Sequence, residues 1–284
     1  MNIFVGTAGF SYKDWAGIVY PIDLNTPNIP PLQYILLRSS PPVNGQAVVR
    51  LVNDANPKFL FTAKLYKAFT HSPLATVEPT SASTLRFSSE DEKLTREGLD
   101  SLFAEGKLGA ELAHFPISFK KVEENREYLE KLIAMFGDYP LAVEVRHSSW
   151  SDPAVLREFS RLGVGFVNIH QPLLGRAMRG TAHVTCPTGY VRLHGRNYQQ
   201  WFAAKRTEDR YNFLYTPDQL EPWKERIEEI SEQAERTFVV ANNHHLGKAA
   251  ANATELKSML SGKKVKAPTE LVKTYPELVA FAVT

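Results

Sequence analysis

The chain of 284 residues has a single cysteine, Cys186, and no long apolar run. One thiol cannot form an intrachain disulfide, and it excludes a cysteine-rich zinc site. No stretch approaches the roughly 20 apolar residues that cross a bilayer, and the N-terminus lacks the basic segment of a signal peptide. The sequence therefore predicts a soluble cytoplasmic protein with no membrane partner.

The chain also lacks a strong charge of either sign. Its formal net charge is +2 and its pI is about 8.5, which is too mild to indicate a nucleic-acid partner from bulk electrostatics. Hydrophobic residues make up 43% of the sequence, enough to bury a sizeable core. Any charge that binds a ligand must therefore be a local cluster.

Short apolar segments that resemble β-strands alternate with intervals of helical length. We expect strands near residues 3–6, 34–37, 58–65, 108–115, 141–145, 164–169, 190–196 and 237–241. We expect helices at 43–53, from Ser89 (with Glu92 as its capping partner) to about 107, and at 123–136, 153–162, 217–234 and after Gly247.

This alternation, without a linker-like break, favours one domain with a parallel sheet. We predict an α/β fold, a single irregular (β/α)8 TIM-like barrel over residues 1–262, with residues 263–284 as a C-terminal surface appendage. The barrel is expected to be irregular because the helices after the first and sixth strands are weak or missing.

Polar side chains gather where the expected strands end. They are Lys64, His114, Glu144, Arg146, Asn168, His170, Arg192, His194 and Asn242. Barrels of this class place their active sites at the carboxyl ends of the strands. The sequence therefore predicts a functional site at this end of the sheet.

The segment Tyr190–Arg196 indicates the charge of the ligand. In a strand, Val191 and Leu193 share one face, while Arg192, His194 and Arg196 share the other. A row of cationic side chains favours a cavity that binds an anion. The alternative is a solvated strand edge whose charges prevent aggregation.

One hypothesis is an acid–base enzyme that acts on an anionic substrate. Glu144, His147 and His194 would be its catalytic residues, and Arg146, Arg192 and Arg196 would hold the anion, with no cofactor or metal required. Two alternatives stay open. Glu144 could form a structural ion pair with a barrel Arg or with Lys64, and His147 could cap the turn that follows it.

Two other kinds of site are considered. His114, Glu144, His170 and His194 could converge on a divalent metal, although nearby cations oppose this. The aromatic and basic loop 198–215 suits either a stacking platform for nucleic acid or an apolar lid that orders over a ligand. The expected partner is thus an anionic small molecule or a phosphodiester, with nucleic acid as a possible form of it.

Five motifs occur in order along nearly the whole chain. They are Val5-Gly6-Thr7-Ala8-Gly9-Phe10-Ser11-Tyr12 with Trp15, Phe61-Thr62-Ala63-Lys64 with His71, Glu144-Val145-Arg146-His147, Tyr190 to Arg196, and Asn242-Asn243 with Gly247. Together they resemble the YecE-like family, usually catalogued as a domain of unknown function. The resemblance implies a TIM-barrel-like fold and no established activity.

We place Tyr12, Trp15, Lys64, His71, Asn242 and Asn243, which lie in these motifs, among the predicted substrate-binding residues, with Arg146, Arg192 and Arg196.

The chain departs from the pattern of this family in three places. The segment 34–37 carries no acid, His114 stands where a Gln is common, and Asn168 stands where an acid is common. The missing carboxylates weaken a metal-dependent interpretation.

Overall fold

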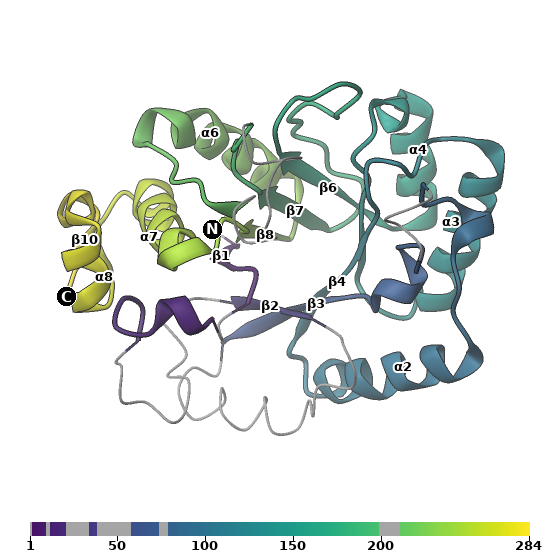
Figure 1. The fold of residues 1–284 in the computed structure, drawn as a ribbon, viewed down its shortest axis with the longest axis horizontal. Coiled ribbons are helices and arrows are strands. Elements are labelled where there is room, and N and C mark those ends of the chain that lie inside the picture. The colour runs from purple at the N-terminus through teal and green to yellow at the C-terminus, as the bar shows by residue number, and fades with distance from the viewer. Residues whose placement is uncertain (1, 10–11, 21–33, 39–57, 74–78, 199–210) are drawn as a thin grey trace.

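The computed structural model describes residues 2–9, 12–20, 34–38, 58–73, 79–198 and 211–284. Its centre is a curled sheet of parallel strands (Figure 1). The strands are β1 (Ile3–Thr7), β2 (Tyr34–Arg38), β3 (Leu60–Lys64), β4 (Leu108–His114), β5 (Leu141–Glu144), β6 (Gly165–His170), β7 (Thr188–Leu193) and β8 (Arg236–Ala241).

Neighbouring strands of this sheet pair in sequence order, and β8 also pairs with β1. The β1–β8 ladder joins five residue pairs, whereas the β1–β2 ladder joins only two. The predicted α/β class is confirmed in this form, as a curled parallel sheet with helices outside it. Each of the eight strands lies within two residues of the expected bounds at its N-terminal end.

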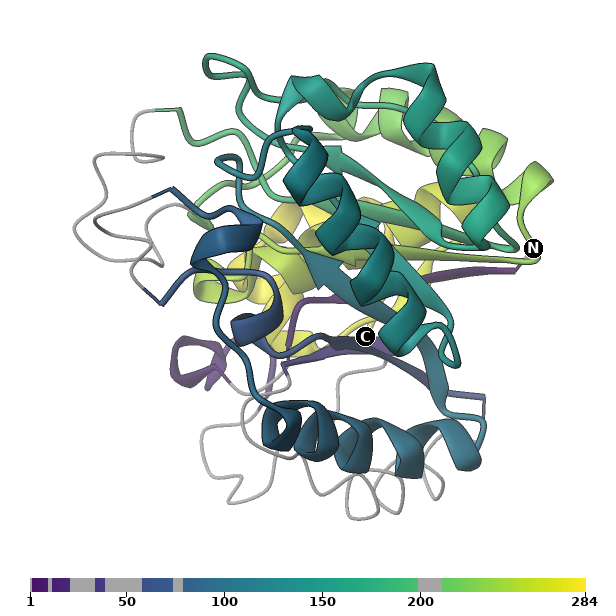
Figure 2. The same cartoon turned by 90° about the vertical axis from the view of Figure 1, so that its right-hand side faces the viewer.

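Helices cover the outer face of the sheet. They are α2 (Ser89–Ala104), α3 (Glu123–Phe136), α4 (Pro153–Leu162), α6 (Pro217–Gln233), α7 (Lys248–Ser261) and α8 (Thr269–Thr274). Figure 1 separates α2, α3 and α4 from α6 and α7, and Figure 2 shows the first three lying over the strands. The expected helix at 43–53 lies outside the described residues.

Local sequence explains where these helices begin. The side chain of Asp152 caps α4 by accepting from Ala154 N at 2.8 Å, and Thr216 forms a capping box at the start of α6 with Gln219. At α2 the N-cap lies one residue before the expected Ser89. Ser88 caps the helix and exchanges hydrogen bonds with Asp91, which stands at the third helical position.

A hydrogen bond identifies the inner face of the curled sheet. Tyr190 Oη on β7 donates to Thr62 Oγ1 on β3 at 3.0 Å, and these strands are not neighbours, so both side chains point inside. Because strand side chains alternate, Arg192 also points inside, whereas Val191 points outward. Asn168 is in register with Val191 and therefore faces the outer layer.

The segment after the sixth strand and the C-terminal segment after α7 depart from the regular alternation of strand and helix. Residues 171–187, which connect β6 to β7, contain no helix, as expected. At the other end of the molecule, β9 (Val265–Lys266) pairs with β10 (Ala282–Val283). Leu271 and Leu278 of this C-terminal segment are buried in the same apolar cluster as α7. The domain boundary at 262 stays a prediction.

The C-terminal segment also contacts the loop after β8. Tyr275 Oη donates to Leu246 O at 2.6 Å, and Leu246 N donates to the carboxylate of Asp14 at 2.6 Å. Leu246 has a positive φ of 53°, a conformation that costs energy for a residue with a branched side chain. None of the helices in the described ranges is long and apolar enough to cross a membrane.

Candidate functional site

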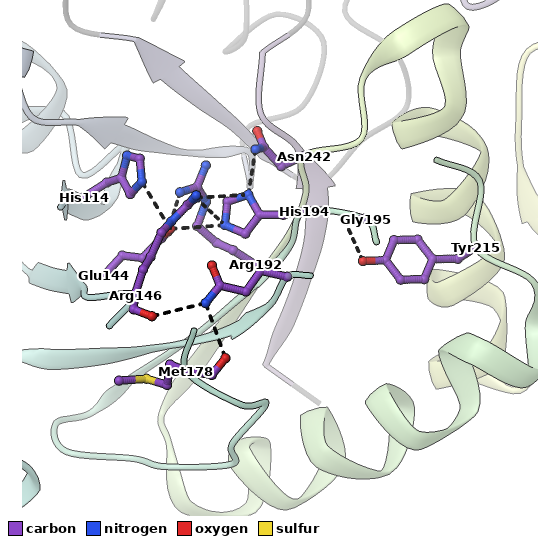
Figure 3. Close-up of polar contacts among 10 residues, drawn as sticks. His114, Glu144, Arg146, Met178, Arg192, His194, Gly195, Tyr215 and Asn242 are labelled. Atoms are coloured by element: carbon purple, nitrogen blue, oxygen red, sulfur yellow. Dashed lines mark hydrogen bonds and ion pairs between the residues drawn. The ribbon is translucent and has the colours of Figure 1, made fainter. Parts of the chain in front are cut away.

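Side chains from the ends of three strands meet at the carboxyl edge of the sheet (Figure 3). Glu144 is the last residue of β5, Arg192 lies in β7, and His194 and Asn242 directly follow β7 and β8. Arg146 follows β5 by two residues and turns back to the same group. The structure brings together these five residues, which the sequence analysis placed at strand ends, and their role in binding or catalysis stays a prediction.

Glu144 is the centre of this cluster. Its side chain is fully buried, and its two oxygens bind different arginines. Arg146 Nε donates to Oε1 at 2.8 Å, and Arg192 Nη1 donates to Oε2. Two guanidinium groups thus share one carboxylate, which is the ion-pair arrangement that the sequence analysis left open.

The pairing sets the charge of Glu144. Burial alone would raise the pKa of this carboxyl, but Arg192, His114 and Arg146 outweigh burial and lower its pKa well below the ordinary value. A carboxylate held this way is a weak proton acceptor. Its arrangement favours the role of a counter-ion over the predicted role of a general base.

His194 is wedged between Glu144 and Asn242. Asn242 Nδ2 lies 2.8 Å from Nδ1 of the ring, and Glu144 Oε1 lies 3.1 Å from Nε2. Arg146 Nη2, which can only donate, also lies 3.0 Å from Nε2, so this nitrogen faces a donor and an acceptor at once. Burial and the charge of Arg146 lower the pKa of His194 to about 3, so the ring is neutral at pH 7.

The backbone of Arg146 is fixed by hydrogen bonds from two residues that the sequence analysis did not single out. Its backbone oxygen accepts from Met178 N at 2.8 Å and from Gln171 Nε2 at 3.3 Å (Figure 3). Gln171 is 3% exposed and directly follows β6. Gln171 could have been identified from the sequence as a polar residue at the end of an expected strand.

A second group lies closer to solvent. His114 Nε2 is 3.4 Å from Glu144 Oε1, and the rings of His71 and His114 are 5.2 Å apart. Burial, followed by the charge of Lys64, lowers the pKa of both rings, to about 4 for His71 and well below the ordinary value for His114. Both imidazoles are therefore neutral at pH 7 and stand beside cationic side chains.

Arg196 does not join this cluster, which corrects the prediction made for the segment Tyr190–Arg196. The strand ends at Leu193, and Gly195 has a φ of +83°. A residue in the left-handed region breaks the alternation of a strand, so Arg196 does not follow Arg192 and His194. It lies beside His170, on the outer side of the sheet.

His147 and Asn243 also have other partners. His147 Nδ1 accepts from Ser149 N at 3.1 Å, so it caps the following turn, the alternative that the sequence left open. Asn243 Nδ2 donates to Phe213 O and to Asn252 Oδ1, each at 2.8 Å, and thereby ties the chain before α6 to α7. Neither residue joins the strand-end cluster, and the catalytic role of His147 and the substrate-binding role of Asn243 stay predictions.

Tyr12 and Trp15 support the site from the loop after β1. Trp15 is fully buried, and its Nε1 donates to His244 O at 2.6 Å. The ring of Tyr12 stacks on His244 with centroids 4.4 Å apart. Trp15 is therefore part of the core, which corrects its assignment as a substrate contact.

The four residues proposed as metal ligands do not all lie together in the structure. His170 and Asn168 face the outer layer, where Asn168 Nδ2 donates to His183 O at 2.9 Å. Within the described ranges, no group of three or more His, Cys, Asp or Glu side chains could hold a metal ion. Residues 199–210 of the aromatic loop lie outside the described residues, so the lid and the stacking platform stay predictions.

Comparisons with known proteins agree on one family. Residues 42–275 match the family described as "Protein of unknown function DUF72". The UPF0759 protein YunF of Bacillus subtilis (strain 168) is 28% identical over 221 residues, which is 74% of this chain and 76% of YunF.

Two crystal structures have a similar fold. A DUF72 family protein of Thermotoga maritima is 31% identical, with a TM-score of 0.78 over 92% of this chain and 100% of the other. A DUF72 family protein of Enterococcus faecalis V583 is 23% identical, with a TM-score of 0.73 over 91% of this chain and 95% of the other.

Proposed function

Because this chain belongs to the DUF72 family, whose description names no activity, we propose its function from the site itself: the strand-end cluster binds an anionic ligand that carries a phosphate or carboxylate group. The irregular barrel would be of the (β/α)8 kind, with the ligand at its carboxyl end. One observation supports this most strongly. Arg146 and Arg192 share the single carboxylate of Glu144, so these three buried side chains carry a net positive charge.

Burial increases the effect of that charge. Electrostatic interactions are stronger where water is excluded, and Arg146 is 9% exposed while Arg192 is 3% exposed. A ligand would reach the more open side of the cluster, which carries Arg146, Lys64, His71 and His114. Lys64 lies close enough to both imidazoles for its charge to add to the effect of burial, which lowers the pKa of each ring.

If the protein is an enzyme, the neutral imidazoles provide its proton chemistry. The two ring nitrogens of His114 are buried, and neither has a hydrogen-bond partner within the described part of the chain. Burial and, after it, the charge of Lys64 lower its pKa, and a bound anion would offset that charge and make the ring a stronger base. We therefore propose His114, with His71 beside it, as the proton acceptor in place of Glu144.

Calorimetric titration with inorganic phosphate and with malonate tests the proposal. Both Arg146→Gln and Lys64→Gln should weaken binding about tenfold or more, because a charge-assisted contact contributes about 1.5–3 kcal/mol. Arg161→Gln on α4 is the control and should bind as wild type. Binding should also tighten as the pH falls from 8 to 5, because proton uptake by His71 and His114 accompanies it. Unchanged affinity in both site variants would reject the anion site.

An oligonucleotide titration separates the phosphodiester alternative. Binding through several phosphates would weaken steeply as salt rises, whereas a single anionic group would show a shallow dependence. Tight, steeply salt-dependent binding would favour the nucleic-acid function.

A further inference from the structure

A second cavity lies on the outer side of the sheet, between the end of β6 and the start of α6. It has a volume of about 290 Å³, at the low end for ligand pockets, so it suits a small molecule. Its polar lining comes from His170, Gln171, Arg196, Asp218 and Arg226, and its apolar lining includes Trp223.

Gly195 directs Arg196 into this cavity. The left-handed conformation at Gly195, with φ +83°, turns the chain away from the inner face after His194. A side chain here would also collide with Phe213, because an added Cβ would lie 2.7 Å from the Phe213 Cβ. Gly195 N donates to Tyr215 Oη at 2.8 Å, which fixes the turn.

The same hydroxyl determines which nitrogen of His170 carries a proton. Tyr215 is 2% exposed, and its hydroxyl already accepts from Gly195 N, so its own proton needs an acceptor. His170 Nδ1 lies 3.0 Å away and is that acceptor. The neutral ring then carries its proton on Nε2, which becomes a hydrogen-bond donor at the cavity wall.

The two arginines of the cavity are not neutralised in the way that those of the strand-end cluster are. In the described part of the chain, no ion pair joins Arg196 or Arg226 to a carboxylate, and Asp218 is the one acid in the lining. Arg226 stacks over the Trp223 ring at 5.2 Å. Burial, and after it the charges of Arg196 and Arg226, lowers the pKa of His170 to about 3.

We propose that this cavity is a separate binding site for a small organic anion, whose carboxylate or phosphate group lies against Arg196, Arg226 and His170. Its apolar part would pack on Leu173, Pro222 and Trp223, which also line the cavity. Its charged groups are distinct from those of the strand-end cluster, because Arg146 and Arg192 point to the inner face, although Gln171 lines this cavity and also donates to the backbone oxygen of Arg146. Asp218 limits the net positive charge of the lining and favours a ligand with a single anionic group.

Calorimetric titration with three probes tests this proposal: benzoate, inorganic phosphate, and benzylamine as a cation of similar size. Wild-type protein should bind benzoate or phosphate in the millimolar range or better and should not bind benzylamine. Arg226→Gln and Arg196→Gln should each weaken that binding about tenfold or more, the equivalent of one charge-assisted contact. Arg226→Lys should keep part of the affinity.

Matched variants separate this site from the strand-end cluster. Arg146→Gln, which changes only the inner site, should leave benzoate binding at the outer cavity unchanged, and Arg161→Gln on α4 should have no effect. Loss of benzoate binding in Arg146→Gln but not in Arg226→Gln would overturn the proposal while supporting the inner site. Failure of wild-type protein to bind either anion at about 10 mM would also overturn it. Thermal unfolding of each variant confirms that the fold is kept.

Discussion

Two glutamates, both fully buried in neighbouring strands, are held in opposite charge states. Glu144 ends β5 on the inner face and binds Arg146, Arg192 and His194. Glu111 lies in the middle of β4 on the opposite face, and neither of its oxygens has a hydrogen-bond partner within the described residues. Partners outweigh burial at Glu144 and lower its pKa, whereas burial raises the pKa of Glu111 to about 8. Position in the sheet does not decide the charge of a buried acid, but its partners do.

The largest expected effect comes from Glu144→Gln. This change leaves two buried guanidinium groups without a counter-ion and should destabilise the fold by about 3–5 kcal/mol in urea denaturation. Glu97→Gln is the control, because its partner Lys93 is 4.0 Å away and both side chains are more than half exposed. Its effect should stay within about 0.5 kcal/mol. Equal effects of the two changes would mean that the buried pair contributes no more than a surface pair.

The contribution of Glu111 to the stability of the fold should depend on pH in the opposite direction to that of Glu144. Its folded pKa of about 8 lies above the ordinary value of 4.5, so the folded protein binds a proton that the unfolded chain releases between these values. Stability should therefore fall by roughly 2–4 kcal/mol as the pH rises from 4.5 to 8. Glu111→Gln should abolish this slope, and Glu97→Gln should keep it. Denaturation at several pH values measures both, and a slope unchanged by Glu111→Gln would show that Glu111 is ionised when folded.

The smallest expected effect comes from Asn242→Ala, which touches Glu144 only through His194. The change removes the donor 2.8 Å from His194 Nδ1 and should cost about 1–2 kcal/mol. It should also free the ring to exchange its proton between the two nitrogens, which ¹⁵N NMR shifts of the imidazole report. Asn212→Ala, at an exposed loop position, is the control. An unaltered tautomer in Asn242→Ala would mean that Glu144 alone fixes the ring.

The fold could be predicted well because periodicity marks each element. Helix α3 has the expected bounds at residues 123–136, and α4 ends at Leu162, before Gly163. The cap of α2 could not be chosen, because Ser88 and Ser89 are each followed three residues later by an acid that can complete a capping box.

The site was predicted in part, for a physical reason. Alternation correctly brought Arg192 and Glu144 to the inner face. It failed at Arg196, because nothing in the pattern shows that Gly195 adopts a positive φ and ends the alternation. The pairing of Glu144 with Arg192 depends on the distance between β5 and β7, which are not adjacent in sequence, and this distance follows from the curl of the sheet.

The backbone of Leu246 is bound by residues from both the first and the last segment of the chain. Its backbone is held on one side by Asp14, from the first loop, and on the other by Tyr275, from the last 22 residues. Shortening the chain at Gly262 would remove one of these two holds, and the nearby stack of Tyr12 on His244 would lose support from a segment 263 positions away in sequence. For protein engineering, the segment after Gly262 is therefore a poor place to trim.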